Sequence, residues 1–171
     1  MTETLLDLHF PRPALRVRAL AELTAPSPAV FRAVSETTAA DLARGRTGLG
    51  ARVARRLASE PNGASPLYAQ MLGRGLRVLA SDPLREVVLG FSPTLLRRGF
   101  VHDRRPASVG MGIRYDARRL TVEMRVRPRS PLTRLAAAAA QGPVERFARP
   151  LLDAWLDAVR ARVDIETEGT R

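Results

Sequence analysis

The chain has 171 residues, a formal net charge of +11 and no cysteine, and 45% of its residues are hydrophobic. This length fits one domain with a sizeable core, and the lack of cysteine excludes disulfides, thiolate metal ligands and a cysteine nucleophile. No apolar run reaches the roughly 18 residues of a membrane span, and the acidic start MTETLLDLHF is unlike a secretory signal, so we expect a cytoplasmic protein without a transmembrane segment.

The first part of the chain predicts an N-terminal arm, one strand and two helical regions. Residues 1–12 are expected to be a disordered arm. Residues 14–23 alternate apolar and polar side chains, which is typical of an antiparallel strand with one solvated face. Ser27 and the proline after it are residue types that begin a helix, and a second, weaker helical region spans 38–59, where glycines interrupt it.

The middle of the chain has the pattern of strands. The shorter strands are expected at 67–72, 75–80, 85–91 and, less regularly, 94–101. Two longer segments, 107–115 and 118–127, alternate strictly between apolar and polar residues. Asp116-Ala117-Arg118 between them predicts a hairpin.

The C-terminal part predicts helix. The chain is helix-like from Pro131 onward, with a kink or restart expected at Gly142-Pro143. Residues 143–163 form a long amphipathic pattern, because their apolar residues recur at spacings of three and four. The acidic segment 164–171 is expected to be a frayed tail.

The order and local sequence of these elements resemble the START-like (helix-grip) superfamily, which includes polyketide cyclase/dehydrase-type and lipid-transfer proteins. ALRVRALAELTAPSPAVFRAV is similar to the opening strand and following helix, REVVLGF to a middle strand, and ASVGMGIRYDARRLTVEMRVRPRSPLTR to the late hairpin. The resemblance covers about residues 13–163, between the arm and the tail. It implies an α+β fold in which a curved antiparallel sheet wraps around the long C-terminal helix, with two short helices after the first strand.

The resemblance also implies a cavity between the sheet and the last helix. Nearly all inward positions of the predicted strands are hydrocarbon or thioether, which suits a hydrophobic small-molecule ligand held by burial. The candidate ligand-binding residues are Phe91, Met111, Tyr115, Met124, Phe147, Leu151 and Trp155. For each of them the alternative is plain core. The hydroxyl of Tyr115 could hold a ligand oxygen or lie in solvent at the rim of the sheet, and Trp155 could fill the core or stack on a ring-shaped ligand.

The sequence shows no catalytic constellation, so catalytic residues remain unassigned. It lacks nucleophile-elbow, P-loop and zinc-protease motifs. His9 and His102 have no carboxylate or second histidine at ligand-like spacing, so we expect no metal site and no cofactor. We favour binding of a lipid or polyketide-like molecule. The alternative is a cyclase or aromatase in the same cavity, which predicts two or more polar groups, Tyr115 among them, converging on the ligand.

A third hypothesis comes from the charge. All 28 basic residues are arginine, which we interpret mainly as the composition of a GC-rich genome. They concentrate in 42–59, 97–105 and 124–144, and such clusters favour nucleic acid, acidic proteins or anionic lipid. Aromatic residues are only 5% and are not interleaved with these arginines, so nucleic acid is weakly supported. A basic module for RNA, the ribosome or an anionic membrane would require one contiguous arginine patch and salt-dependent binding.

Overall fold

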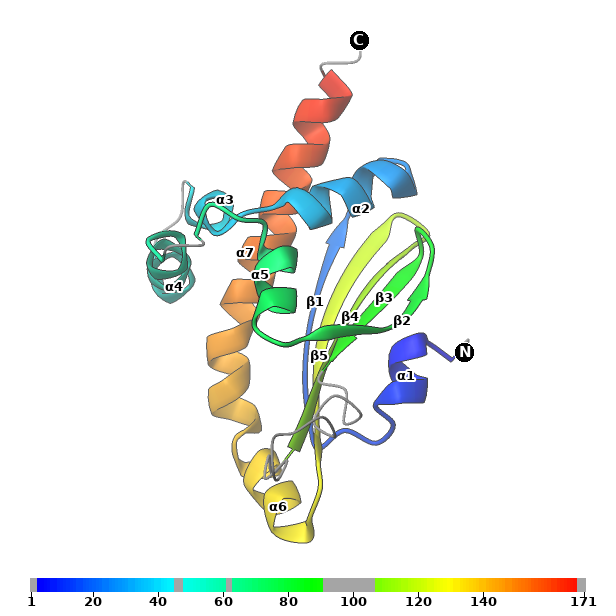
Figure 1. Ribbon diagram of the computed structural model, residues 1–171, viewed down its shortest axis with the longest axis vertical. Helices are drawn as coiled ribbons and strands as arrows, with labels where there is room; N and C mark the ends of the chain where they lie inside the picture. Colours follow the sequence, from blue (N-terminus) through cyan, green and yellow to red (C-terminus); the bar gives the residue numbers. More distant parts are fainter. Residues whose placement is uncertain (1–2, 45–47, 61–62, 91–106, 169–171) are drawn as a thin grey trace.

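An antiparallel sheet of five strands forms the centre of the computed structural model, which describes residues 3–44, 48–60, 63–90 and 107–168 (Figure 1). The strands are β1 (Leu15–Glu22), β2 (Arg77–Asp82), β3 (Glu86–Gly90), β4 (Ala107–Asp116) and β5 (Arg119–Pro128). Their spatial order is β1-β5-β4-β3-β2, so β1 and β2 are the edges. The fold class is therefore α+β, as expected.

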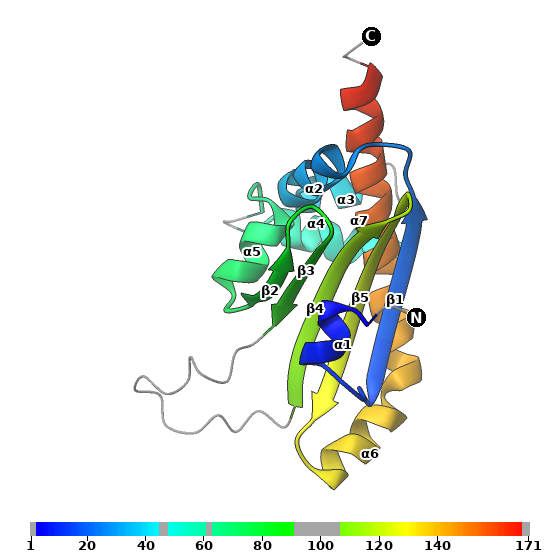
Figure 2. The same ribbon diagram turned by 90° about the vertical axis from the view of Figure 1, so that its right-hand side faces the viewer.

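Helices lie on both faces of this sheet, but most of them are on one face. They are α1 (Leu5–His9), α2 (Ser27–Glu36), α3 (Ala39–Ala43), α4 (Gly48–Ala58), α5 (Leu67–Gly73), α6 (Pro131–Ala139) and α7 (Gln141–Glu168). The long helix α7 runs beside β1, with α2 to α5 on the same side of the sheet, whereas α1 lies on the other side (Figure 2). We call these the inner and outer faces.

Most expected elements are present, with boundaries that agree to within two residues. The segment 14–23 contains β1, and the helix predicted from Ser27 is α2. The predicted hairpin is formed by β4 and β5, which pair along their whole length. In these segments local chemistry and tertiary burial favour the same structure, because alternating residues place one apolar face on the core.

Three expectations were wrong. Residues 67–72 form α5 rather than a strand, and Leu67 and Met71, four residues apart, both pack on the core; short apolar runs do not distinguish the two structures. The last helix begins at Gln141 and continues to Glu168, through most of the expected tail. The N-terminal arm contains the ordered helix α1. The predicted strand 94–101 lies outside the described residues.

The main core lies between the inner face and the helices. Every second residue of β1 is buried, from Leu15 to Ala21. The C-terminal half of α7 buries its apolar stripe, including Trp155, Leu156 and Val159. Removing such side chains from water contributes about 25 cal/mol per Å² of apolar surface. This burial therefore fixes α7 against β1.

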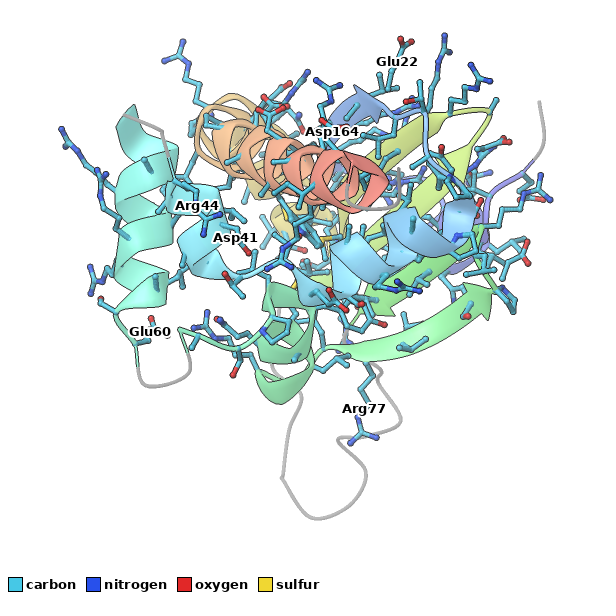
Figure 3. The ribbon with its side chains drawn as sticks, turned by 90° about the horizontal axis from the view of Figure 1, so that it is seen from above. Glu22, Asp41, Arg44, Glu60, Arg77 and Asp164 are labelled. Atoms are coloured by element: carbon cyan, nitrogen blue, oxygen red, sulfur yellow. The ribbon has the colours of Figure 1, made fainter. Side chains whose placement is uncertain are left out.

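Side-chain contacts fix both ends of α7. At its start, the Gln141 amide accepts a hydrogen bond from Arg16 N at 3.0 Å and donates one to Arg16 O at 2.7 Å, which satisfies backbone groups of an edge strand. Near its C-terminus, Arg162 pairs with Asp41 of α3 at 2.8 Å. Asp41 Oδ1 also lies 3.4 Å from Arg44 Nη2, and both residues are labelled in the view from above (Figure 3). The helix is thus held to β1 and to α3.

Candidate functional site

The inner face of β4 and β5 carries the paired methionines of the candidate ligand site. Met111 and Met124 are directly opposite each other in the register of the hairpin. Met111 is buried, whereas Met124 is only half-buried. Because the next inner-face pair, Val109 and Val126, is also only half-buried, the inner face becomes more accessible toward the end of the sheet at which α6 lies (Figure 1).

The same gradient appears along α7. Trp155 is 5% exposed, Leu151 is half-buried and Phe147 is 48% exposed, and these residues are four apart on one side of the helix. Since Gln141 is bonded to Arg16, the helix begins level with the half-buried end of the sheet. We call this region the apolar inner surface. It consists of Val109, Met124, Val126, Val144, Phe147, Ala148 and Leu151.

Tyr115 has a structural partner for its hydroxyl. The oxygen lies 2.7 Å from Ala25 O and 3.1 Å from Leu23 O, so its single proton is held by main-chain acceptors after β1. Burial raises the pKa of this phenol, against the opposing charge of Arg118. The hydroxyl thus joins β4 to the segment that leads into α2 instead of lying in solvent. The ring can still form part of an apolar wall.

Trp155 differs from Tyr115 in the hydrogen bonding of its polar group. Within the described part of the chain, its indole Nε1 is buried and has no hydrogen-bond partner. A buried donor without an acceptor costs about 1–3 kcal/mol, so such a group merits a functional explanation. It lies at the inner end of the Phe147–Leu151–Trp155 stripe. The last of the predicted ligand residues, Phe91, lies outside the described residues.

A polar cavity of about 480 Å³ lies on the outer face, beside α1. Its charged lining residues are Asp7, Arg16, Arg18, Glu86, Arg114, Asp116, Arg119, Glu123 and Arg125. Arg16 and Arg125 are neighbours across β1 and β5, and Glu123 Oε1 accepts from the Nε of both at 2.5 Å. Glu123 thus neutralises two arginines, whereas Arg114 pairs with Asp116.

The ionic groups of this outer cavity hold α1. Arg125 also pairs with Asp7 at 2.7 Å. Burial alone would raise the pKa of Asp7, but hydrogen bonds from Thr4 and the Arg125 guanidinium outweigh it and lower the pKa to about 2. Burial would likewise lower the pKa of Arg125, but its bonds to Glu123 and Asp7 raise it. The ion pairs of Arg125 with Asp7 and Glu123 therefore support the fold of the N-terminus on this side of the cavity.

Neither candidate region has the features of a metal centre. In the part of the chain that the structure describes, histidine, aspartate and glutamate nowhere gather in a group of three that could hold a metal ion.

Among the described helices, none combines the length and the apolar character needed to cross a membrane.

Comparison with known proteins gives little further information. No protein-family model matches the chain, and no curated protein is similar to it. One solved structure, the crystal structure of TTHA0849 from Thermus thermophilus, has 10% sequence identity and a TM-score of 0.32, over 88% of this chain and 98% of that chain. This likeness is too distant to establish a family.

Proposed function

We propose that this is a cytoplasmic protein with a START-like, helix-grip fold that binds a hydrophobic small molecule, lipid or polyketide-like, against the apolar inner surface. The observation that carries the proposal is the burial gradient along α7, from Trp155 at 5% exposure to Phe147 at 48%. All members of the apolar inner surface have hydrocarbon or thioether side chains, so a ligand there would be held by burial.

Covering this surface can contribute enough free energy to hold a ligand. Covering 200 Å² of this surface would contribute on the order of 5 kcal/mol at about 25 cal/mol per Å². Met124 supports a ligand of variable shape, because its unbranched thioether side chain adapts to irregular partners. The unpartnered Nε1 of Trp155 supports a ligand with one oxygen acceptor at its inner end.

The cyclase alternative is less well supported. It requires polar groups that converge on a bound chain, and Tyr115 is the one polar residue among the inner-face positions of β4 and β5. Its hydroxyl proton is already held by Ala25 O and Leu23 O. A protein that only binds its ligand needs no converging polar groups, so a binding function agrees better with the residues described.

The first test is native mass spectrometry of the protein purified from its own host. We expect an additional mass that is lost on denaturation and that corresponds to an apolar compound. Trp155 is the sole tryptophan, so energy transfer from it to a dansyl-labelled undecanoic acid measures binding directly. Absence of both a co-purified compound and energy transfer would contradict the proposal.

Matched variants on α7 locate the ligand. Leu151→Asn should weaken binding of the dansyl fatty acid at least tenfold, because it places an amide on the apolar inner surface. Ile165→Asn is the control, since Ile165 lies on the same helix and is 65% exposed at its other end. Equal affinities for the two variants would place the ligand elsewhere.

A further inference from the structure

The end of the molecule opposite the C-terminus carries two strongly exposed leucines. Leu132 is 81% exposed and Leu135 is 72% exposed. Their spacing of three places them on one side of α6, and none of the residues of α6, all of which are described, is buried. The helix begins with a well-formed N-cap, in which Ser130 accepts a hydrogen bond from Thr133 N. It is therefore an ordered helix with an apolar side toward solvent.

The segment that contains these leucines is rich in exposed arginines. Arg127, Arg129 and Arg134 are all exposed, and the sequence contains no acidic residue from 124 to 144. A shallow cavity of about 510 Å³ joins Arg129, Arg134 and Leu135. We call this surface the α6 tip. It consists of Arg127, Arg129, Leu132, Arg134 and Leu135, and Figure 1 shows α6 at the extreme lower end of the molecule.

We propose that the α6 tip docks on an anionic membrane surface. Exposed leucines on a short helix can enter the headgroup layer, and arginines beside them can pair with lipid phosphates. The extreme position of α6 would allow a flat surface to reach both leucines at once. RNA fits less well, because exposed leucines contribute nothing to phosphate binding and the tip has no aromatic residue on which bases could stack. The inference goes beyond ligand binding and does not depend on it.

Co-sedimentation of the full chain with vesicles tests the proposal. We expect binding to vesicles of phosphatidylcholine with 30% phosphatidylglycerol, much weaker binding to phosphatidylcholine alone, and a decrease as salt is raised. Replacing both leucines, L132S/L135S, should lower partitioning about tenfold or more. The control L20S/L84S changes two leucines that are 46% and 49% exposed elsewhere and should bind like the wild type.

The charge contribution is tested separately. The variant R127Q/R134Q should reduce binding by about fivefold for each arginine, whereas R52Q/R55Q, which removes the same charge from α4, should have a small effect. If all four double variants lose binding equally, or none does, the α6 tip is not the binding surface and the proposal is wrong. Stronger effects of the tip variants on binding to poly(U) RNA than on vesicle binding would also overturn it.

A probe at the tip measures insertion itself. Because the chain has no cysteine, L135C offers a unique site for an environment-sensitive NBD label. On anionic vesicles its emission should shift to the blue and rise severalfold, while a label at L84C should not change. An unshifted label at position 135 would show that the leucines stay in water and would overturn the proposal. Dansyl fatty-acid binding by L132S/L135S shows separately whether the ligand site is intact.

Discussion

Glu86 and Arg125 hold opposite ends of the same short helix, α1, from the outer face of the sheet. The Glu86 carboxylate accepts hydrogen bonds from Leu5 N and Leu6 N, both at 3.1 Å, and Arg125 donates to Phe10 O at 3.2 Å. The negative group is at the N-terminus and the positive group at the C-terminal end, as the helix dipole favours. Both side chains are buried, so α1 belongs to the folded domain.

Removing the buried guanidinium should therefore destabilise the protein strongly. Arg125→Met leaves Asp7 without its ion pair and the buried Glu123 with only Arg16, and loss of one partner of a buried pair costs about 3–5 kcal/mol. Urea unfolding measures the loss. Arg114→Met is the control, because the Arg114–Asp116 pair is partly exposed and should contribute less than about 1 kcal/mol. Similar losses for both variants would refute this account of the α1 anchor.

The sequence already contained a local signal for α1. Thr4 and Asp7 form a capping box, in which each side chain bonds the other's backbone N–H. This signal alone does not predict a stable helix, because a five-residue helix is unstable by itself. What stabilises it is distant in the chain: Leu6 and Phe10 pack with Val88. The local sequence around α1 does not show which distant residues it packs against.

The β4–β5 hairpin shows which features the sequence does determine. Strict alternation and a two-residue connection fix the register, and the register places Met111 opposite Met124. That part of the candidate ligand surface was therefore predictable. The partners of Tyr115 were not, because the Leu23 and Ala25 carbonyls are backbone groups from a segment about 90 residues earlier. The burial gradient along α7 also depends on tertiary packing rather than on its regular apolar spacing.

Gly110 provides space for the docking of α1. A Cβ atom there would lie 2.2 Å from Phe10 Cε2, so Gly110→Ala should displace the ring and cost about 1–3 kcal/mol. In a Phe10→Ala background the same substitution should cost much less, because the clashing ring is gone, and a double-mutant cycle measures this coupling. Gly73→Ala is the control, since nothing lies within 4 Å of its Cβ position. Additive losses of the free energy of unfolding for Gly110→Ala and Phe10→Ala would exclude direct contact between the two residues.

The β4–β5 turn is strained and can be improved. Ala117 and Arg118 have φ angles of 47° and 66°, which favour asparagine and glycine in a two-residue hairpin turn. Replacing them together, A117N/R118G, should raise the free energy of unfolding by about 1–2 kcal/mol without changing the pairing of β4 and β5. Thermal unfolding measures the gain. A lower midpoint would indicate that the Arg118 side chain stabilises the turn more than its backbone strain destabilises it.

The low pKa of Asp7 predicts how stability depends on pH. Its pKa is about 2 in the folded protein, against 3.8 for the unperturbed group, so the unfolded state binds the proton first. The stabilisation is complete above about pH 4 and is lost as the pH falls from 4 toward 2. Asp7→Asn lacks this stabilisation, so the difference in the free energy of unfolding between wild type and variant should shrink as the pH falls over this range. Because the Asp7 side chain is 38% exposed, the effect is screened by solvent; a constant difference would refute the assignment.

Tyr115→Phe separates support of the fold from contact with a ligand. The variant loses only the hydroxyl that donates to Ala25 O at 2.7 Å and Leu23 O at 3.1 Å, and leaves carbonyls without a donor, so it should cost about 1 kcal/mol in urea unfolding. Affinity for the dansyl fatty acid should stay within twofold, because the ring is retained. A tenfold loss of affinity at unchanged stability would instead mean that the hydroxyl leaves its main-chain acceptors to bind the ligand, which would favour the cyclase alternative.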